Sequence, residues 1–151
     1  MRVFLCSYGD SGFSLAIPME HISSIFLLSK EEISLCQRNF SENRFLYGSE
    51  NNTYISLPVL FNYPQPNIRH GIILKSADEN NIILLTTEVD SELEIPNENF
   101  YSLPKAFNSL VFSSIFEGIL FNFAYTDKSD GDLILLLNPA QLLQYIKKEQ
   151  P

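Results

Sequence analysis

The sequence has few of the residues that build metal and nucleotide sites. Its 151 residues include two histidines, two cysteines and six glycines. A zinc site needs about three or four Cys, His or carboxylate ligands at short spacings, and no such cluster occurs in the sequence. Glycine-rich phosphate loops such as G-x-G-x-x-G are missing too. We therefore expect neither a metal nor a cofactor, and most nucleotide chemistry is excluded.

Positive charge and long apolar runs are also scarce. The chain has 10 Lys and Arg against 18 Asp and Glu, which gives a formal net charge of −8. Nucleic acids and anionic membranes are bound by clusters of Lys and Arg that displace counterions. No window approaches the ~18 apolar residues of a membrane helix, and the opening apolar run is too short for a signal peptide. We expect a cytoplasmic protein that binds no nucleic acid and inserts into no membrane.

The remaining composition is that of a folded domain. Hydrophobic residues make up 45% of the chain and charged residues 19%. A chain of this length buries roughly 68–70% of its unfolded surface, so it needs no disulfide or metal to fold. Cys6 and Cys36 are expected to be free thiols, because a reducing compartment keeps cysteines unpaired.

Short strands separated by turns dominate the chain. Continuous apolar runs at 71–75 and 82–87 predict strands that are buried on both faces. Residues 58–61 can continue a strand past Pro58 if that strand lies at an edge or contains a bulge, and 93–96 form a further short strand. The four predicted hairpins pair residues 3–7 with 13–17, 45–47 with 54–57, 71–75 with 82–87, and 116–125 with 132–137.

Helical signals occur at two places. Ile22, Ile25 and Phe26 fall at i, i+3 and i+4, with Met19 one turn earlier, which predicts a short amphipathic helix or a helical turn. The polar segment that follows, 29–42, is weakly patterned and predicts a loop.

The second helix is predicted at the end of the chain. Asn138 is a good N-cap, and Pro139 suits the first helical position. Leu142 and Ile146 share one face of the expected helix. Eight to ten short strands with two small helices predict a mainly β fold of small barrels rather than a βαβ sheet.

Two strings resemble chemical motifs but fit turns better. The G-D-S-G of 9–12 occurs around the nucleophile of chymotrypsin-like proteases, yet only ten residues precede Ser11, too few to carry the histidine and aspartate that come first there. The acidic run 127–132 resembles a calcium loop, but Thr126 and Leu137 fall on two of its ligand positions. Both strings predict hairpin turns.

The titratable residues indicate no enzyme. His21 and His70 have no second histidine or cysteine nearby in the sequence. Carboxylates at alternate positions predict one solvated acidic face rather than a paired acid and base. These carboxylates are Glu88, Asp90, Glu92 and Glu94.

The order of the elements resembles the CheW-like domain, the adaptor module of bacterial chemotaxis. Residues 17–25 (I-P-M-E-H-I-S-S-I) are similar to that family's "a-I-P-v-e-x-V-x-e-I", and 57–60 (L-P-V-L) to its "i-P-V-i". Similar matches follow in order across nearly the whole chain. They are at residues 84–89, 93–96, 103–104, 116–119, 135–138 and 142–143.

The resemblance implies a fold and a function. The fold would be one CheW-like domain over residues 1–151, built of two intertwined five-stranded SH3-like β-barrels with a shared core. The function would be that of a non-enzymatic adaptor. Its partners would be the regulatory domain of a CheA-like histidine kinase and the cytoplasmic tip of methyl-accepting chemotaxis receptors.

The resemblance also implies protein-binding residues. By position, the receptor-facing groove between the subdomains would be lined by Ile22 and Ile25, with Pro58 and Val59 nearby. The same four residues would also fit ordinary core packing.

Several polar positions differ from the family's pattern. Thr53-Tyr54 stands where the family has Arg-Gly, and Phe61, Thr87 and Asn138 stand where it has aspartates. An alternative hypothesis follows: a protein that kept the fold for a structural or regulatory role but changed its partner, or that associates with itself.

Overall fold

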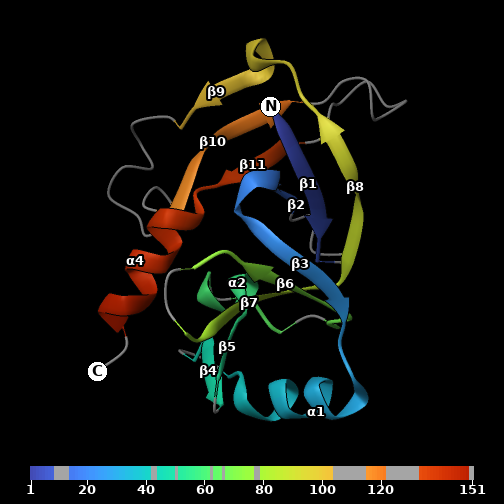
Figure 1. Cartoon of the computed structure of the whole chain (residues 1–151), viewed down its shortest axis with the longest axis vertical. Helices are drawn as coiled ribbons and strands as arrows, with labels where there is room; N and C mark the ends of the chain where they lie inside the picture. Colours follow the sequence, from blue (N-terminus) through green and yellow to red (C-terminus); the bar gives the residue numbers. More distant parts are fainter. Residues whose placement is uncertain are drawn as a thin grey trace. The chain divides into compact units, whose positions relative to one another are not determined.

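The chain is built mainly of β-strands in two sheets, with a few short helices (Figure 1). The computed structural model describes residues 1–8, 14–41, 44–49, 51–61, 63–65, 67–76, 79–103, 115–121 and 133–149. The predicted mainly β, two-sheet class is confirmed.

The described residues form a series of short strands with short helices and turns between some of them. The strands are β1 (Arg2–Ser7), β2 (Ser14–Pro18), β3 (Ile22–Leu27), β4 (Leu46–Ser49), β5 (Asn52–Ile55), β6 (His70–Leu74), β7 (Asn81–Thr86), β8 (Glu88–Glu94), β9 (Phe100–Ser102), β10 (Phe116–Phe121) and β11 (Leu133–Leu137). The helices are α1 (Lys30–Asn39), α2 (Leu57–Leu60) and α4 (Pro139–Glu149), with 3-10 turns η2 (Met19–His21) and η3 (Asn97–Asn99).

The chain divides into two compact units. The first contains Met1–Leu5, Ser14–Glu20 and Ser91–Pro151, and the second contains Cys6–Phe13 and His21–Asp90. The second unit is almost one continuous stretch, whereas the first draws on both ends of the chain.

The second unit holds a five-stranded sheet in the order β3-β6-β7-β5-β4. Its neighbouring strands run antiparallel, apart from the parallel pair β5 and β7. One face of this sheet packs on α1, which lies below β4 and β5 in Figure 1. The buried cluster on that face comprises Leu28, Cys36, Phe40, Tyr54, Val59, Ile68, Ile83 and Leu85.

The first unit holds most of a six-stranded sheet in the order β8-β1-β2-β11-β10-β9. The parallel pair β2 and β11 joins Leu15 to Leu135, so the two ends of the chain meet in this sheet. The buried cluster on one face comprises Val3, Leu5, Ala16, Ile95, Leu120, Ile134 and Leu136.

The predicted hairpins are confirmed where the structure describes them. β1 neighbours β2, and the pairs β4/β5, β6/β7 and β10/β11 are antiparallel. Ile82 and Leu85 lie in a strand with every residue from 82 to 86 buried, as the continuous apolar run predicted. The C-terminal helix begins at Pro139, and its N-cap is Asn138, whose Oδ1 accepts a hydrogen bond from the Gln141 N–H at 3.2 Å. The strings at 9–12 and 127–132 lie outside the described residues.

The helix predicted around Ile22 and Ile25 is wrong. These residues lie in strand β3, preceded only by the short turn η2. A β-bulge between Ile22 and Ser24 adds one residue to the strand. Because of that bulge, Ile22 and Ile25 face the same side although they are three residues apart, a spacing that resembles a helix.

The loop predicted for 29–42 is also wrong, because α1 occupies most of it. The Ser29 Oγ accepts from the Glu32 N–H at 3.1 Å, and the Glu32 Oε1 accepts from the Ser29 N–H at 3.1 Å. This reciprocal pair is a capping box that starts the helix. Cys36 in the helix and Phe40 at its C-cap both belong to the buried cluster.

The continuation of a strand through 58–61 is wrong as well. Residues 57–60 form α2, in which the Leu60 N–H donates to the Ser56 carbonyl at 3.1 Å. Pro58 lies in the first turn of this helix, where its missing N–H has no partner to lose and its fixed φ is already helical.

Candidate functional site

The predicted protein-binding residues lie on two faces of the five-stranded sheet. Ile22 and Ile25 pair across the strands with Leu74 and Ile72, so they share the face of those residues. Val59 belongs to the cluster on the opposite face, with Ile83 among its members. The structure therefore brings Ile22 and Ile25 together and separates them from Val59.

Pro58 and Val59 offer little surface. Pro58 is buried, and Val59 is 7% exposed. For these two residues the structure supports the core-packing alternative. Their role in binding a partner stays a prediction.

Ile22 and Ile25 begin an apolar stripe on β3. The stripe continues to Leu27, which was not predicted from the sequence as a binding residue. The Ile22 and Ile25 side chains are half-buried, and Leu27, two residues beyond Ile25 on the same face, is 70% exposed. We call Ile22, Ile25 and Leu27 the β3 stripe. The alternation of Ile25, Phe26 and Leu27 in a strand places Leu27 on the same face as Ile25. Because this segment was predicted as a helix, in which residues two apart do not share a face, Leu27 was not predicted.

The β3 stripe lies at an edge of its sheet. In the described strand order, β3 has only β6 as a neighbour. Ser23 and Ser24 are exposed, so the bulge is also at the surface. An exposed edge with apolar side chains is a feature of protein–protein contact surfaces.

Two polar side chains, each with a buried atom that lacks a hydrogen-bond partner among the described residues, lie in the same row of the sheet as Leu27. Leu27 pairs with His70, and His70 pairs with Thr86 across the next ladder. The His70 Nδ1 and the Thr86 Oγ1 are buried, and neither has a hydrogen-bond partner among the described residues. Such groups are rare in folded proteins because they lose their hydration without replacement.

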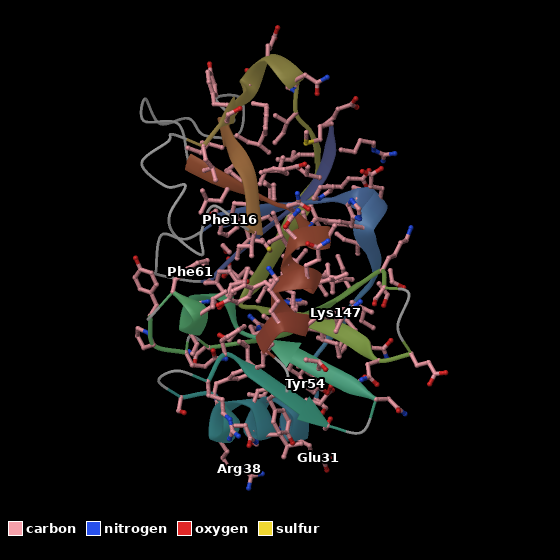
Figure 2. The ribbon with its side chains drawn as sticks, turned by 90° about the vertical axis from the view of Figure 1, so that its left-hand side faces the viewer. Glu31, Arg38, Tyr54, Phe61, Phe116 and Lys147 are labelled. Atoms are coloured by element: carbon pink, nitrogen blue, oxygen red, sulfur yellow. The ribbon has the colours of Figure 1, made fainter. Side chains whose placement is uncertain are left out.

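Glu32 connects α1 to the sheet. Its Oε2 accepts a hydrogen bond from the Tyr54 hydroxyl at 3.0 Å, while its Oε1 closes the capping box. Burial, and then the bond to the Glu32 carboxylate, raises the pKa of Tyr54 to about 12. Figure 2 shows Tyr54 inside this region, with Glu31 and Arg38 pointing outward from α1.

The two cysteines are free, as the sequence predicted, and both are fully buried. Burial raises the pKa of the Cys36 thiol to about 12, with a smaller contribution from Glu32. Burial also raises the pKa of Cys6, with Asp90 adding to the effect. Because the thiolate is the reactive form, neither thiol is arranged as a nucleophile at neutral pH.

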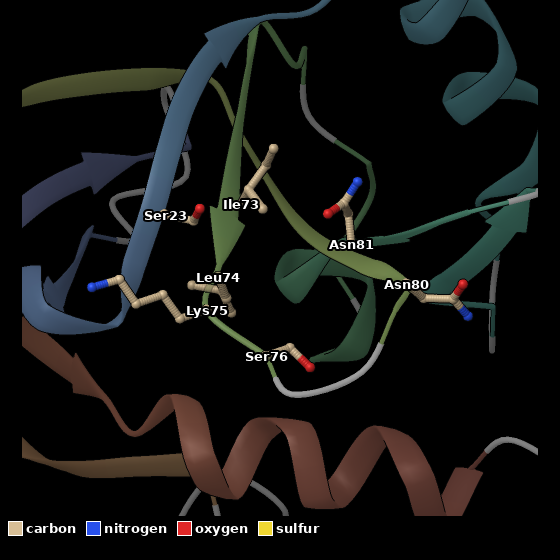
Figure 3. A pocket seen from close by; sticks show the side chains of 7 residues that line it. All are labelled: Ser23, Ile73, Leu74, Lys75, Ser76, Asn80 and Asn81. Carbon is tan, nitrogen blue, oxygen red and sulfur yellow. The ribbon is translucent and has the colours of Figure 1, made fainter.

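A shallow hollow of about 180 Å³ lies at the end of β6 and the start of β7. Its lining includes Ser23, Lys75, Asn80 and Asn81. Figure 3 shows Lys75 pointing toward β3 and Asn80 pointing the opposite way. The polar groups therefore do not converge on one point, as the groups of a ligand site do.

The acidic face predicted for β8 is present. Glu88, Asp90, Glu92 and Glu94 occupy alternate positions, and all four are exposed. Glu92 forms an ion pair with Arg2. Partial burial, and then the neighbouring Glu88 charge, raises the pKa of Asp90.

The described residues contain neither a metal-ligand cluster nor a membrane-spanning helix. No group of three or more His, Cys, Asp or Glu side chains there is placed to hold a metal ion. No helix in that part of the chain is long and apolar enough to span a membrane.

Comparison with known proteins identifies the fold. No protein-family model matches the sequence, and no curated protein is similar to it in sequence. The structure is similar to the crystal structure of the scaffolding protein CheW from Thermoanaerobacter tengcongensis, with a TM-score of 0.59 and 14% identity. The match covers 91% of this chain and 88% of that chain. At this identity the likeness shows a CheW-like fold, and the partners implied by the sequence resemblance stay predictions.

Proposed function

We propose that the chain is a non-enzymatic adaptor that couples chemotaxis-type receptors to a histidine kinase in the cytoplasm. The observation that carries the proposal is the likeness to a CheW scaffolding protein over nearly the full length of both chains. The proposed partners are the regulatory domain of a CheA-like kinase and the cytoplasmic tip of methyl-accepting receptors. The protein would act by surface contacts, without chemistry of its own.

The β3 stripe is the surface proposed to contact the receptor tip. It combines exposed or half-buried apolar side chains with the surface location that docking needs. Ile22 and Ile25 begin the stripe, and Leu27 supplies its most exposed side chain. Pro58 and Val59 would support the sheet from the opposite face rather than contact the partner.

The test is a binding titration of the purified chain with receptor-tip fragments and with the kinase regulatory domain, up to tens of micromolar, roughly −6 to −7 kcal/mol of binding free energy. Ile22→Glu is expected to abolish receptor binding, because it places a charge among apolar contacts. Leu35→Glu is the matched control, since Leu35 is 37% exposed on α1, away from the stripe.

Circular dichroism of both variants separates docking from folding. A folded Ile22→Glu chain that still binds receptor tips with unchanged affinity contradicts the assignment of the stripe. Absence of binding by the unaltered chain to both partners contradicts the adaptor proposal itself.

A second candidate function is favoured by the altered polar positions. Thr87, where the family has an aspartate, donates through its Oγ1 to the Asn67 carbonyl at 2.5 Å. Asn138 caps α4, and Tyr54 is buried against Glu32. The side chains of Thr87, Asn138 and Tyr54 thus form hydrogen bonds within the chain. If the chain has a different partner, co-purification from its own cells is expected to yield that partner and neither the histidine kinase nor the receptor.

A further inference from the structure

The outer edge of β3 carries open main-chain groups. Hydrogen-bonded and non-bonded residue pairs alternate along an antiparallel ladder. The Leu28 N–H donates to the Arg69 carbonyl at 2.9 Å, which fixes the phase of the ladder between β3 and β6. Phe26 therefore bonds toward β6, whereas the N–H and C=O groups of Ile25 and Leu27 point away from it.

No described strand pairs with that outer edge. The side chains there add apolar surface, because Leu27 is 70% exposed. An edge of this kind, with open main-chain groups and an apolar side chain, accepts an additional strand.

The other edge strands of the two sheets are protected. β8 carries four exposed carboxylates, β9 has three residues, and β4 has four residues with Gly48 among them. Charge and shortness are the usual means by which proteins prevent edges from pairing. β3 has six residues and no charge, and only its bulge near Ile22 serves this purpose.

We propose that β3 pairs with β3 of a second copy of this chain. An antiparallel pairing about a two-fold axis would join the open groups of Ile25 and Leu27 in each copy to those of the other. The charge pattern favours this occupant: the strand is neutral, so two copies bring no like charges face to face within the pairing. A β8–β8 pairing would bring eight carboxylates together.

The pairing is expected to be weak and reversible. Only the part of β3 beyond the bulge has a regular ladder, and an interface of that length falls below the roughly 1,200 Å² of a stable complex. The net charge of −8 opposes association of two copies. Added salt screens that repulsion, so dimer formation should increase with ionic strength.

The experiment is sedimentation equilibrium of the full chain alone, from about 10 μM to about 1 mM. The mass should rise from monomer toward dimer, at lower concentration in high salt. Leu27→Lys, a charge at the open edge, should shift the midpoint at least about tenfold to higher concentration. Leu35→Lys makes the same change on α1 and should leave the midpoint where it was.

Hydrogen exchange of the unaltered chain gives a second readout that depends on no variant. The amides of Ile25 and Leu27 should exchange more slowly as the concentration rises, while the Phe26 amide should be protected at every concentration. A mass that stays monomeric up to about 1 mM, a dimer insensitive to Leu27→Lys, or unchanged exchange at Ile25 and Leu27 overturns the proposal. Because this test uses no partner protein, its failure leaves the adaptor function standing, and the reverse holds too.

Discussion

The two sheets differ in how their outer strands meet solvent. β8, at one edge of the six-stranded sheet, presents four exposed carboxylates, one of them paired with Arg2. β3, at one edge of the five-stranded sheet, is uncharged and exposes Leu27. Both strands have six or seven residues, so length does not distinguish them. The difference indicates that β8 is kept from pairing by charge, and that β3 is the strand available for contacts.

The two sheets also differ in how the chain assembles them. The five-stranded sheet forms within residues 22–86, whereas the six-stranded sheet joins Leu15 to Leu135. Contacts between distant residues form more slowly because a longer loop must close first. The six-stranded sheet is therefore expected to depend more on the integrity of the whole chain.

The largest expected effect concerns a glycine in each sheet. A Cβ added at Gly118 would meet the Tyr101 main-chain oxygen, which cannot move without breaking the pairing of β9 and β10. A Cβ at Gly71 would meet side chains and no main-chain atom, namely the half-buried Phe26 ring at 2.7 Å and the Ile83 Cγ2 at 2.9 Å. Gly118→Ala is expected to lower the free energy of unfolding by about 3 kcal/mol or more, and Gly71→Ala by about 1–2 kcal/mol.

Urea unfolding followed by circular dichroism measures both losses. Gly48→Ala is the control, because nothing lies within 4 Å of its added Cβ, and its effect should stay within about 0.5 kcal/mol. A Gly71→Ala loss as large as that of Gly118→Ala contradicts the contrast between a rigid main-chain neighbour and movable side chains.

A smaller effect is expected at Glu32, whose carboxylate accepts a hydrogen bond that links α1 to the five-stranded sheet. Glu32→Ala removes the capping box and the bond to the Tyr54 hydroxyl. The free energy of unfolding should fall by about 2 kcal/mol. Glu31→Ala, at an exposed neighbour in the same helical turn, should cost only about 0.5 kcal/mol. Equal losses for the two variants would show that neither the bond to the Ser29 N–H nor the bond to the Tyr54 hydroxyl adds stability.

The same residue links stability to alkaline pH. The pKa of Tyr54 is raised from its ordinary 10.0 to about 12 in the folded chain. Its contribution is therefore complete below pH 10 and is lost as the pH rises from 10 toward 12, because the unfolded chain loses the proton first. Unfolding measurements should show a shallower loss over this range in Glu32→Gln than in the unaltered chain.

The smallest expected effect tests the charged edge. Glu88→Gln, Asp90→Asn and Glu94→Gln together remove the three β8 carboxylates that form no ion pair with another described residue, and leave the Arg2–Glu92 pair. The variant is expected to remain folded and to associate weakly at concentrations near 1 mM, about −4 kcal/mol. Sedimentation in the Leu27→Lys background isolates this edge from β3. A monomeric variant would show that something other than charge protects β8.

The hairpins and the final helix were predictable because their signals are local. Continuous apolar runs, turn residues and the Asn138-Pro139 cap each act within a few residues. The α1 capping box at Ser29 and Glu32 was equally local, and its pattern was present in the sequence. It was overlooked because the segment has few apolar residues.

The candidate site was only partly predictable, because its residues are arranged by pairing with other strands. The bulge in β3 depends on its register with β6, and it decides that Ile22 and Ile25 share a face. Val59 was placed near them by chain position, yet the sheet lies between. Neither the shared face of Ile22 and Ile25 nor the position of Val59 on the opposite face can be predicted from the spacing of these residues alone.

The sequence by itself determined the paired strands of the hairpins, the acidic face of β8, the scarcity of metal and phosphate ligands, and a resemblance to the CheW-like fold. Each of these depends on residue type and local period. The tertiary structure alone decided that β3 is an edge strand, that Leu27 is exposed at 70%, and that Pro58 and Val59 are buried. The physical reason is that exposure and strand order depend on which distant segments pair, and those pairings are settled by the whole chain.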